Sequence, residues 1–168
     1  MEEKYGADLL TGNGNIKLTS IELINNNDPN LPLQLKGKMD QYRAATSAGD
    51  RIYLQSVLPV ELNDIPFKLE KRLYPIEMNY PQEVSIIMDL GIPAGYKIES
   101  LPEPIRYVTE HDGLQVIYNA SPKADRLNIT MKYIAKQLFF EAEDYETLKH
   151  LFNQRHEKFN EQIVLVKS

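Results

Sequence analysis

The 168-residue sequence contains no cysteine and no tryptophan. Without cysteine, the chain itself supplies no disulfide, no thiolate ligand for zinc and no cysteine nucleophile. No apolar run approaches the roughly 20 residues that cross a bilayer as a helix, so the sequence predicts no membrane span. Its start, MEEKYGADLL, lacks the basic and apolar regions of a secretory signal peptide. These absences exclude thiol chemistry by this chain and favour function classes that need neither a thiol nor a membrane helix.

The charge balance argues against nucleic acid as a partner. The chain carries 19 Lys and Arg against 24 Asp and Glu, a net charge of −5, and its basic residues are dispersed. Charged residues make up 26% and apolar residues 42%, which is ordinary globular composition. We expect a flexible, turn-like lead-in over residues 1–15 and a single β-rich domain over residues 16–168, with room for a subdivision near residues 60–75.

Alternation of apolar and polar residues predicts most of the strands. It is regular in 33–40, 84–90 and 127–136, so each segment presents one face to a core. In 16–25 the alternation slips by one residue, which predicts a bulge near Thr19 and Ser20.

Turn residues and prolines divide the rest of the chain. The segments 105–109 and 114–119 flank His111-Asp112-Gly113, where Asp-Gly predicts a tight hairpin turn with positive φ. A second turn is expected over 121–125. Seven of the ten prolines lie between residues 59 and 104, so we expect extended connections and short edge strands there, with no helix.

One helix is predicted, from residue 143 to about residue 160, followed by a short strand over 162–166. Its apolar stripe is Tyr145, Leu148, Phe152, Phe159 and Ile163, and the opposite face is polar. A short strand is also expected over 51–55. The predicted fold is mainly β: an antiparallel β-sandwich, immunoglobulin- or fibronectin-like in general character, with one C-terminal amphipathic helix.

His111 lies between Glu110 and Asp112, which is one candidate for an acid/base or metal cluster. We favour a solvated polar turn, because Asp-Gly already has a structural role at that point. An enzyme built on this triplet is therefore the least favoured function.

The other two histidines lie on the predicted helix. His150 is one turn from Glu146 and about two turns from Glu157, a pattern that allows a metal but is more typical of a solvated face. His156 borders the apolar stripe. The acidic residues Glu143 and Asp144 complement the helix dipole, so they predict no carboxylate pair for catalysis.

Tyrosines are the only candidates for a binding site. Ten are present, and Tyr74, Tyr80 and Tyr96 lie near prolines, where exposed rings could stack on sugars or peptides. The more ordinary interpretation is that such rings edge a β core while the hydroxyls reach water. The sequence predicts no catalytic residue, no metal site and no cofactor.

Four segments resemble one protein family: PFKLEKRLYPIE at 66–77, NYP at 79–81, IPAGYKIESLPEP at 92–104 and EQIVL at 161–165. Their order and spacing resemble the carboxy-terminal domain, a domain of unknown function, of bacterial transglutaminase-like proteins. The resemblance covers roughly residues 50–168, and residues 16–40 resemble the segment that follows the catalytic core of that family.

The resemblance implies a β-rich module in a periplasmic or extracellular setting, and a parent protein that hydrolyses or cross-links peptides. The catalytic Cys, His and Asp of that family lie in the core, so no catalytic residue carries over to this chain. We therefore expect a non-catalytic accessory domain that packs against, or presents substrate to, a core in cis. The missing signal peptide fits an excised carboxy-terminal fragment. The alternative is a free-standing module that binds cell-surface glycans or peptides.

Overall fold

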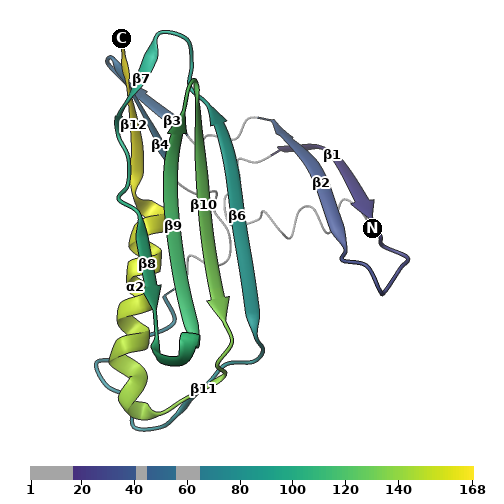
Figure 1. Ribbon diagram of the computed structural model, residues 1–168, viewed down its shortest axis with the longest axis vertical. Helices are drawn as coiled ribbons and strands as arrows, with labels where there is room; N and C mark the ends of the chain where they lie inside the picture. Colours follow the sequence, from purple (N-terminus) through teal and green to yellow (C-terminus); the bar gives the residue numbers. More distant parts are fainter. Residues whose placement is uncertain (1–16, 41–44, 56–64) are drawn as a thin grey trace. The chain divides into compact units, whose positions relative to one another are not determined.

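The structure is a computed structural model that describes residues 17–40, 45–55 and 65–168 (Figure 1). Across these ranges the chain is mainly β, with antiparallel sheets and one long helix near its C-terminal end, as the sequence predicts. It divides into two compact units, of which the first contains β1 and β2 and the second contains every other described element. The predicted lead-in over 1–15 lies outside the described residues.

The first unit is a hairpin of β1 (Lys17–Ile24) and β2 (Gln34–Asp40). The pairing register shifts between Leu18 and Ser20, which confirms the bulge predicted there. The alternation in 33–40 also predicted a face that supplies a core, and this part is wrong for the leucines: Leu33 is 66% exposed and Leu35 is 38% exposed. A two-stranded sheet has no second layer of its own, so alternation alone does not bury its apolar face.

The second unit holds two four-stranded antiparallel sheets. The first has the order β6-β10-β9-β8 and consists of β6 (Gln82–Gly91), β8 (Ile105–Val108), β9 (Leu114–Lys123) and β10 (Arg126–Ala135). The second has the order β3-β4-β12-β7 and consists of β3 (Ala45–Ala48), β4 (Arg51–Gln55), β7 (Tyr96–Ser100) and β12 (Gln162–Lys167). A small sheet pairs β5 (Ile76–Glu77) with β11 (Phe139–Phe140).

Helix α2 (Tyr145–Asn160) follows a 3-10 turn, η3 (Ala142–Asp144), and ends where the sequence predicts. The carboxylate of Asp144 accepts a 3.0 Å hydrogen bond from the Glu141 backbone N–H, as part of a capping box that supplies partners at the start of the helical segment. Figure 1 shows α2 running beside the β6-β10-β9-β8 sheet. The Phe152 ring meets the Tyr133 ring with centroids 6.0 Å apart, so the helix covers the face that carries Tyr133.

We call that face of the sheet the inner face. On β10 it carries Leu127, Ile129, Met131, Tyr133 and Ala135, all between 1% and 3% exposed. On β9 it carries Leu114, Val116 and Tyr118, which are no more than 1% exposed. Side chains directly opposite each other on paired strands share a face, so these two strands form one continuous apolar layer under the helix. The strand predicted over 127–136 is therefore confirmed, together with its role in the core.

The connection between β8 and β9 is a 3-10 turn, η2 (Glu110–Asp112), longer than the tight turn that Asp-Gly predicts. Within this turn the positive φ belongs to Asp112, at 56°, whereas Gly113 has φ −62°. Glycine is favoured at position 113 for a different reason: a Cβ there would lie 2.5 Å from Oε1 of Gln137. The Gly113 carbonyl also accepts hydrogen bonds from the backbone N–H groups of Lys136 and Gln137. The turn is thereby fixed to the end of β10.

The turn predicted over 121–125 is shorter than expected, because β9 continues to Lys123 and only Ala124 and Asp125 separate it from β10. Pro122 is accommodated inside the strand because β8 pairs with β9 no further than Tyr118. Beyond that point one edge of β9 has no partner strand among the described residues, so the missing N–H of proline costs no ladder hydrogen bond there.

Replacing Ile129 with Ala should lower the free energy of unfolding by about 2–5 kcal/mol, because Ile129 is 1% exposed and its loss opens a cavity in the inner face. The matched control is Ile87→Ala on β6, where the side chain is 74% exposed and the expected loss is below about 1 kcal/mol. Chemical denaturation of both variants measures the difference. Equal losses would contradict the assignment of the two faces.

Candidate functional site

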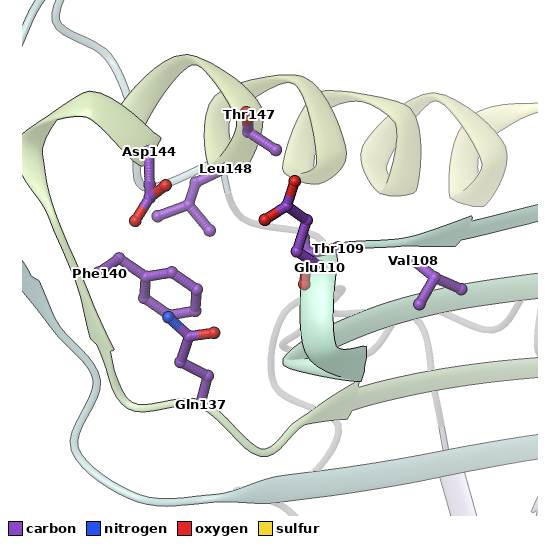
Figure 2. Close-up of a pocket in the computed structure, with 8 residues that line it drawn as sticks. All are labelled: Val108, Thr109, Glu110, Gln137, Phe140, Asp144, Thr147 and Leu148. Atoms are coloured by element: carbon purple, nitrogen blue, oxygen red, sulfur yellow. The ribbon is translucent and has the colours of Figure 1, made fainter.

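A groove of about 490 Å³ lies where η2 approaches the start of α2 (Figure 2). Glu110 and Thr109 come from the turn, and Asp144 and Thr147 come from the helix end, so the groove carries two carboxylates and two hydroxyls. Its apolar lining residues are Val108, Phe140 and Leu148. Glu110, part of the Glu110-His111-Asp112 triplet, and Asp144 line the same groove, which sequence spacing does not indicate.

The acids of this groove are not part of a metal-binding cluster in the part of the chain that the structure describes. The carboxylate of Asp144 is engaged in the capping box with Glu141. Within the described ranges, no three His, Asp or Glu side chains gather as a metal ion would require. Glu110 and Asp144 therefore remain two acids that make the groove suitable for a cationic or hydrogen-bonding group.

The histidine candidates lie in separate places. The side chain of His111 lies outside the described part of the structure. The His150 ring lies edge-on to the Tyr107 ring, with centroids 6.0 Å apart, and the Tyr107 hydroxyl donates a 2.9 Å hydrogen bond to Gln154. His156 contacts Asn160, which donates a 2.8 Å hydrogen bond to the His156 carbonyl. The contacts of His150 connect α2 to β8, which gives this residue a role in packing.

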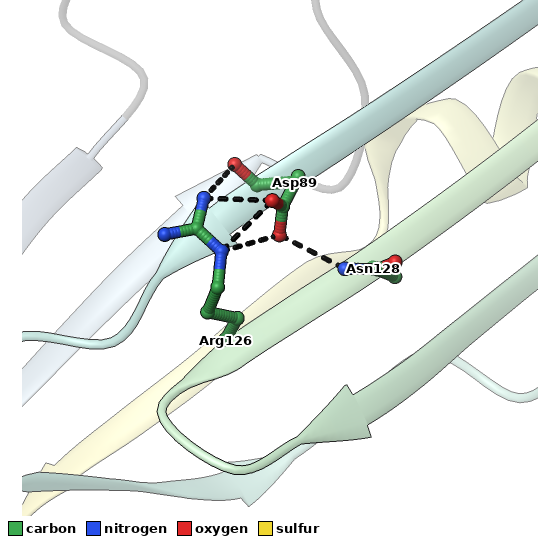
Figure 3. Close-up of polar contacts among 3 residues, drawn as sticks. All are labelled: Asp89, Arg126 and Asn128. Carbon is green, nitrogen blue, oxygen red and sulfur yellow. Dashed lines mark hydrogen bonds and ion pairs between the residues drawn. The ribbon is translucent and has the colours of Figure 1, made fainter.

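A cluster of Asp89, Arg126 and Asn128 joins β6 to β10 near the β9–β10 turn (Figure 3). The Arg126 Nε donates to both Asp89 carboxylate oxygens at 2.8 Å, and the Asn128 amide donates to the same carboxylate at 2.9 Å. The hydrogen bonds from Arg126 hold the pKa of the Asp89 carboxyl below its usual value. Because Asn128 and Asp89 are direct partners in the ladder, the cluster reinforces the strand register.

A second ion pair has a similar role in the other sheet. Arg51 on β4 contacts Glu99 on β7 through two hydrogen bonds of 2.6 and 2.7 Å. Strand β12 lies between these two strands, so the pair spans the central strand. The hydrogen bonds from Arg51 lower the pKa of the Glu99 carboxyl. Both ion pairs are exposed and connect strands, which identifies them as structural features of the sheet surface.

The three tyrosine candidates do not form one site. Tyr74 is 76% exposed in the segment before β5, and Tyr96 is half-buried at the start of β7. Tyr80 is 59% exposed and lines a second pocket, together with Phe67 and Arg155. Arg155 was missed by sequence reasoning, because the helical pattern marks it only as a charged residue. It is 4% exposed and packs among aromatic rings.

These features define a mainly β chain with pockets and structural ion pairs, and the described residues contain no group of three or more acidic or histidine side chains that could hold a metal ion. Residues 50–165 match the model of the family described as "Domain of Unknown Function with solved-structure structure (DUF3858)", and the chain belongs to that family. No curated protein matches the sequence. Among the described residues, no helix combines the length and apolarity that a membrane crossing requires.

The fold also occurs in a solved structure. The chain is similar to the crystal structure of a "putative protease" from Parabacteroides distasonis, with a TM-score of 0.56 and 10% sequence identity. The match covers 69% of this chain and 23% of that protein, so the present chain spans less than a quarter of the relative. At this identity the likeness establishes the shared fold.

Replacing Asp89 with Asn should flatten the acid side of the stability profile. The folded pKa of Asp89 is lower than its unfolded value of about 3.9, so the carboxylate stabilises the fold above that pH and loses this effect as pH falls through the folded pKa. The variant should be less stable than the parent at neutral pH and approach it in acid, as measured by melting temperature. Glu83→Gln, on the same face of β6, should retain the parental profile, and a profile equal to that of Asp89→Asn would contradict the assignment.

Proposed function

We propose that this chain is a non-catalytic accessory module of a larger protein, in which it packs against a catalytic core in cis or presents substrate to it. The surface that we assign to the packing is the outer edge of β6. The single observation that carries the proposal is that this edge is long, continuous and lined on its inner face by half-buried apolar side chains.

Strand β6 pairs with β10 over ten residues, from Gln82 to Gly91. Among the described residues, no strand pairs with its other edge. Exposed edges in proteins are usually protected by a lysine, a proline, a bulge or a short strand. The sequence of β6, QEVSIIMDLG, has no lysine and no proline, and its register is continuous. Its two charged residues, Glu83 and Asp89, lie on the face opposite the inner face. An edge of this kind favours association with another strand.

The side chains of β6 also indicate an incomplete layer. On the inner face, Val84, Ile86 and Met88 are half-buried, whereas their partners on β10 are at most 3% exposed. On the opposite face, Ile87 is 74% exposed. A neighbouring strand or layer that extended the sheet past β6 would bury all four side chains, with a gain of up to about 1.5–3 kcal/mol for each fully buried one.

The comparisons support a role in a larger protein. The family range covers residues 50–165, and the relative of the same fold is more than four times longer than the matched region. The resemblance of the sequence to transglutaminase-like proteins implies that the core is a papain-like domain that processes peptides. It also implies a periplasmic or extracellular location. A relative described as a protease is compatible with a core that acts on peptides.

The alternative is a free-standing module that binds glycans or extended peptides. The observation in its favour is the same edge, because extended peptides add to open sheet edges through backbone hydrogen bonds. The reading frame of the gene separates the two proposals. A cysteine-containing core directly upstream supports the accessory role, and a gene that encodes no core would exclude it.

Replacing Ile87 with Lys should weaken the association of this chain with the separately produced core while leaving the isolated chain almost as stable as before. The side chain is exposed in the isolated chain, so the expected loss of stability is below about 1 kcal/mol. Hydrogen–deuterium exchange of residues 82–91, with and without the core, measures the contact directly. We expect slower exchange of these amides when the core is present.

The matched control is Leu73→Lys, because Leu73 is 85% exposed and lies in the segment before β5, outside β6. This variant should bind the core as the parent does. Unchanged exchange over residues 82–91 on addition of the core, or equal effects of the two lysine variants, would rule out β6 as the packing edge.

A further inference from the structure

A pocket of about 370 Å³ lies on the inner face of the sheet, at the end where β6 begins. Tyr133 and Ala135 of β10 line it, and so does Gln82, the first residue of β6. In the ladder Gln82 is the direct partner of Ala135, so these two side chains share the inner face. The pocket therefore lies beside the start of the edge to which we assign the packing against the core.

The buried part of the lining is mainly apolar. We call its apolar members, each at most 7% exposed, the floor of the pocket: Phe67, Ile76, Tyr133, Ala135 and Phe152. The Phe67 and Phe152 rings meet edge to face, with centroids 4.8 Å apart. Arg155 is also buried in the lining, and its guanidinium is already engaged by the Phe152 and Tyr133 rings, at 4.5 and 4.9 Å from their centroids. A large apolar group would gain from burial against this floor.

The exposed part of the lining carries balanced charge. Arg72 and Glu77 are both exposed, and their charges are opposite. Asn79 and Gln82 are neutral amides, and Tyr80, which is 59% exposed, presents a ring. A charged group would lose hydration at the apolar floor without a net countercharge at the rim, so the pocket favours an uncharged group.

A strand added to the open edge of β6 would bring a side chain to this pocket. Side chains alternate between the two faces of a strand, so those opposite Gln82, Val84 and Ile86 would lie on the inner face. Directly opposite residues have Cβ atoms about 4.5–5.5 Å apart, which places the side chain opposite Gln82 beside the pocket. The volume of the pocket is near the lower end of the range for small-molecule sites and suits one large side chain.

We propose that this pocket receives an uncharged aromatic side chain from the strand with which the core extends the sheet at β6. The inference rests on the proposed packing of the β6 edge and adds the anchor of that contact. Backbone hydrogen bonds along the edge hold the strand, and the pocket selects the residue opposite Gln82. An aromatic ring fits best, because it gains edge-to-face and offset contacts with Tyr80 and with the rings of the floor as well as burial of its apolar area.

The first test compares variants of the full chain in their binding to the separately produced core. Tyr80→Ala should weaken binding about tenfold, because the anchor loses one ring of the pocket. The matched control, Tyr74→Ala, removes an exposed ring outside the lining and should bind as the parent does. Both rings are more than half exposed, so the melting temperatures should stay close to that of the parent, which separates loss of binding from loss of fold.

The Ile87→Lys variant separates this inference from the proposed function. If Ile87→Lys weakens binding of the core and Tyr80→Ala does not, the pocket inference is wrong and the edge assignment stands. If neither variant weakens binding, both are wrong. Equal weakening by Tyr80→Ala and Tyr74→Ala would also contradict the pocket as the anchor site.

The second test uses acetylated and amidated heptapeptides of alternating Thr and Val, in which one Val is replaced by Phe, Ala, Lys or Glu. One set varies the residue near the C-terminal end, which suits antiparallel pairing with β6, and the other set varies the residue near the N-terminal end, which suits parallel pairing. Titration of the full chain, followed by amide chemical shifts, should show one set in which the Phe peptide binds about tenfold tighter than the Ala peptide. The Lys and Glu peptides should bind no tighter than the Ala peptide. Equal binding of the Phe and Ala peptides in both sets, tightest binding of a charged peptide, or no saturable shifts up to about 1 mM would overturn the inference.

Discussion

The contact between β10 and α2 is the constraint on which the rest of the larger unit depends. Strand β10 pairs over its full ten residues with β6 on one side and β9 on the other, so it fixes the register of both. Its inner-face side chains are almost completely buried, and Phe152 of the helix closes over Tyr133. Because buried apolar area is the main source of stability, this strand–helix pair positions the groove and the second pocket, beside Tyr80.

Three ion pairs in this unit support the sheets and the end of the helix. Asp89 with Arg126, and Arg51 with Glu99, each connect two strands at exposed positions. Lys158 is 7% exposed, and its ammonium group lies 2.7 Å from the Glu161 carboxylate, one turn along the chain. Long basic side chains can bury their stems while the charged group finds a partner. These three ion pairs thus connect neighbouring strands or the end of α2.

The elements that the sequence predicts well are those with a strong local period. The alternation in 127–136 and the stripe from Tyr145 to Phe159 identify their buried faces correctly, because both patterns arise within one element. Strand β3 was missed, since its sequence ATSA has no alternation of apolar and polar residues. The burial of Arg155 and the pocket beside Tyr80 were also missed, because they depend on rings from Phe67 and Tyr133 that are far away in the sequence.

The two edge strands of the β6-β10-β9-β8 sheet differ in length and in the burial of their side chains. Strand β8 forms one edge with only four residues, and its Tyr107 is hydrogen-bonded to Gln154 of α2. Short edge strands offer few backbone groups to another strand. Strand β6 forms the other edge with ten residues, and its inner-face side chains are half-buried. A further strand would therefore gain more backbone hydrogen bonds and more apolar burial at β6 than at β8, which makes β6 the favoured edge for extending the sheet.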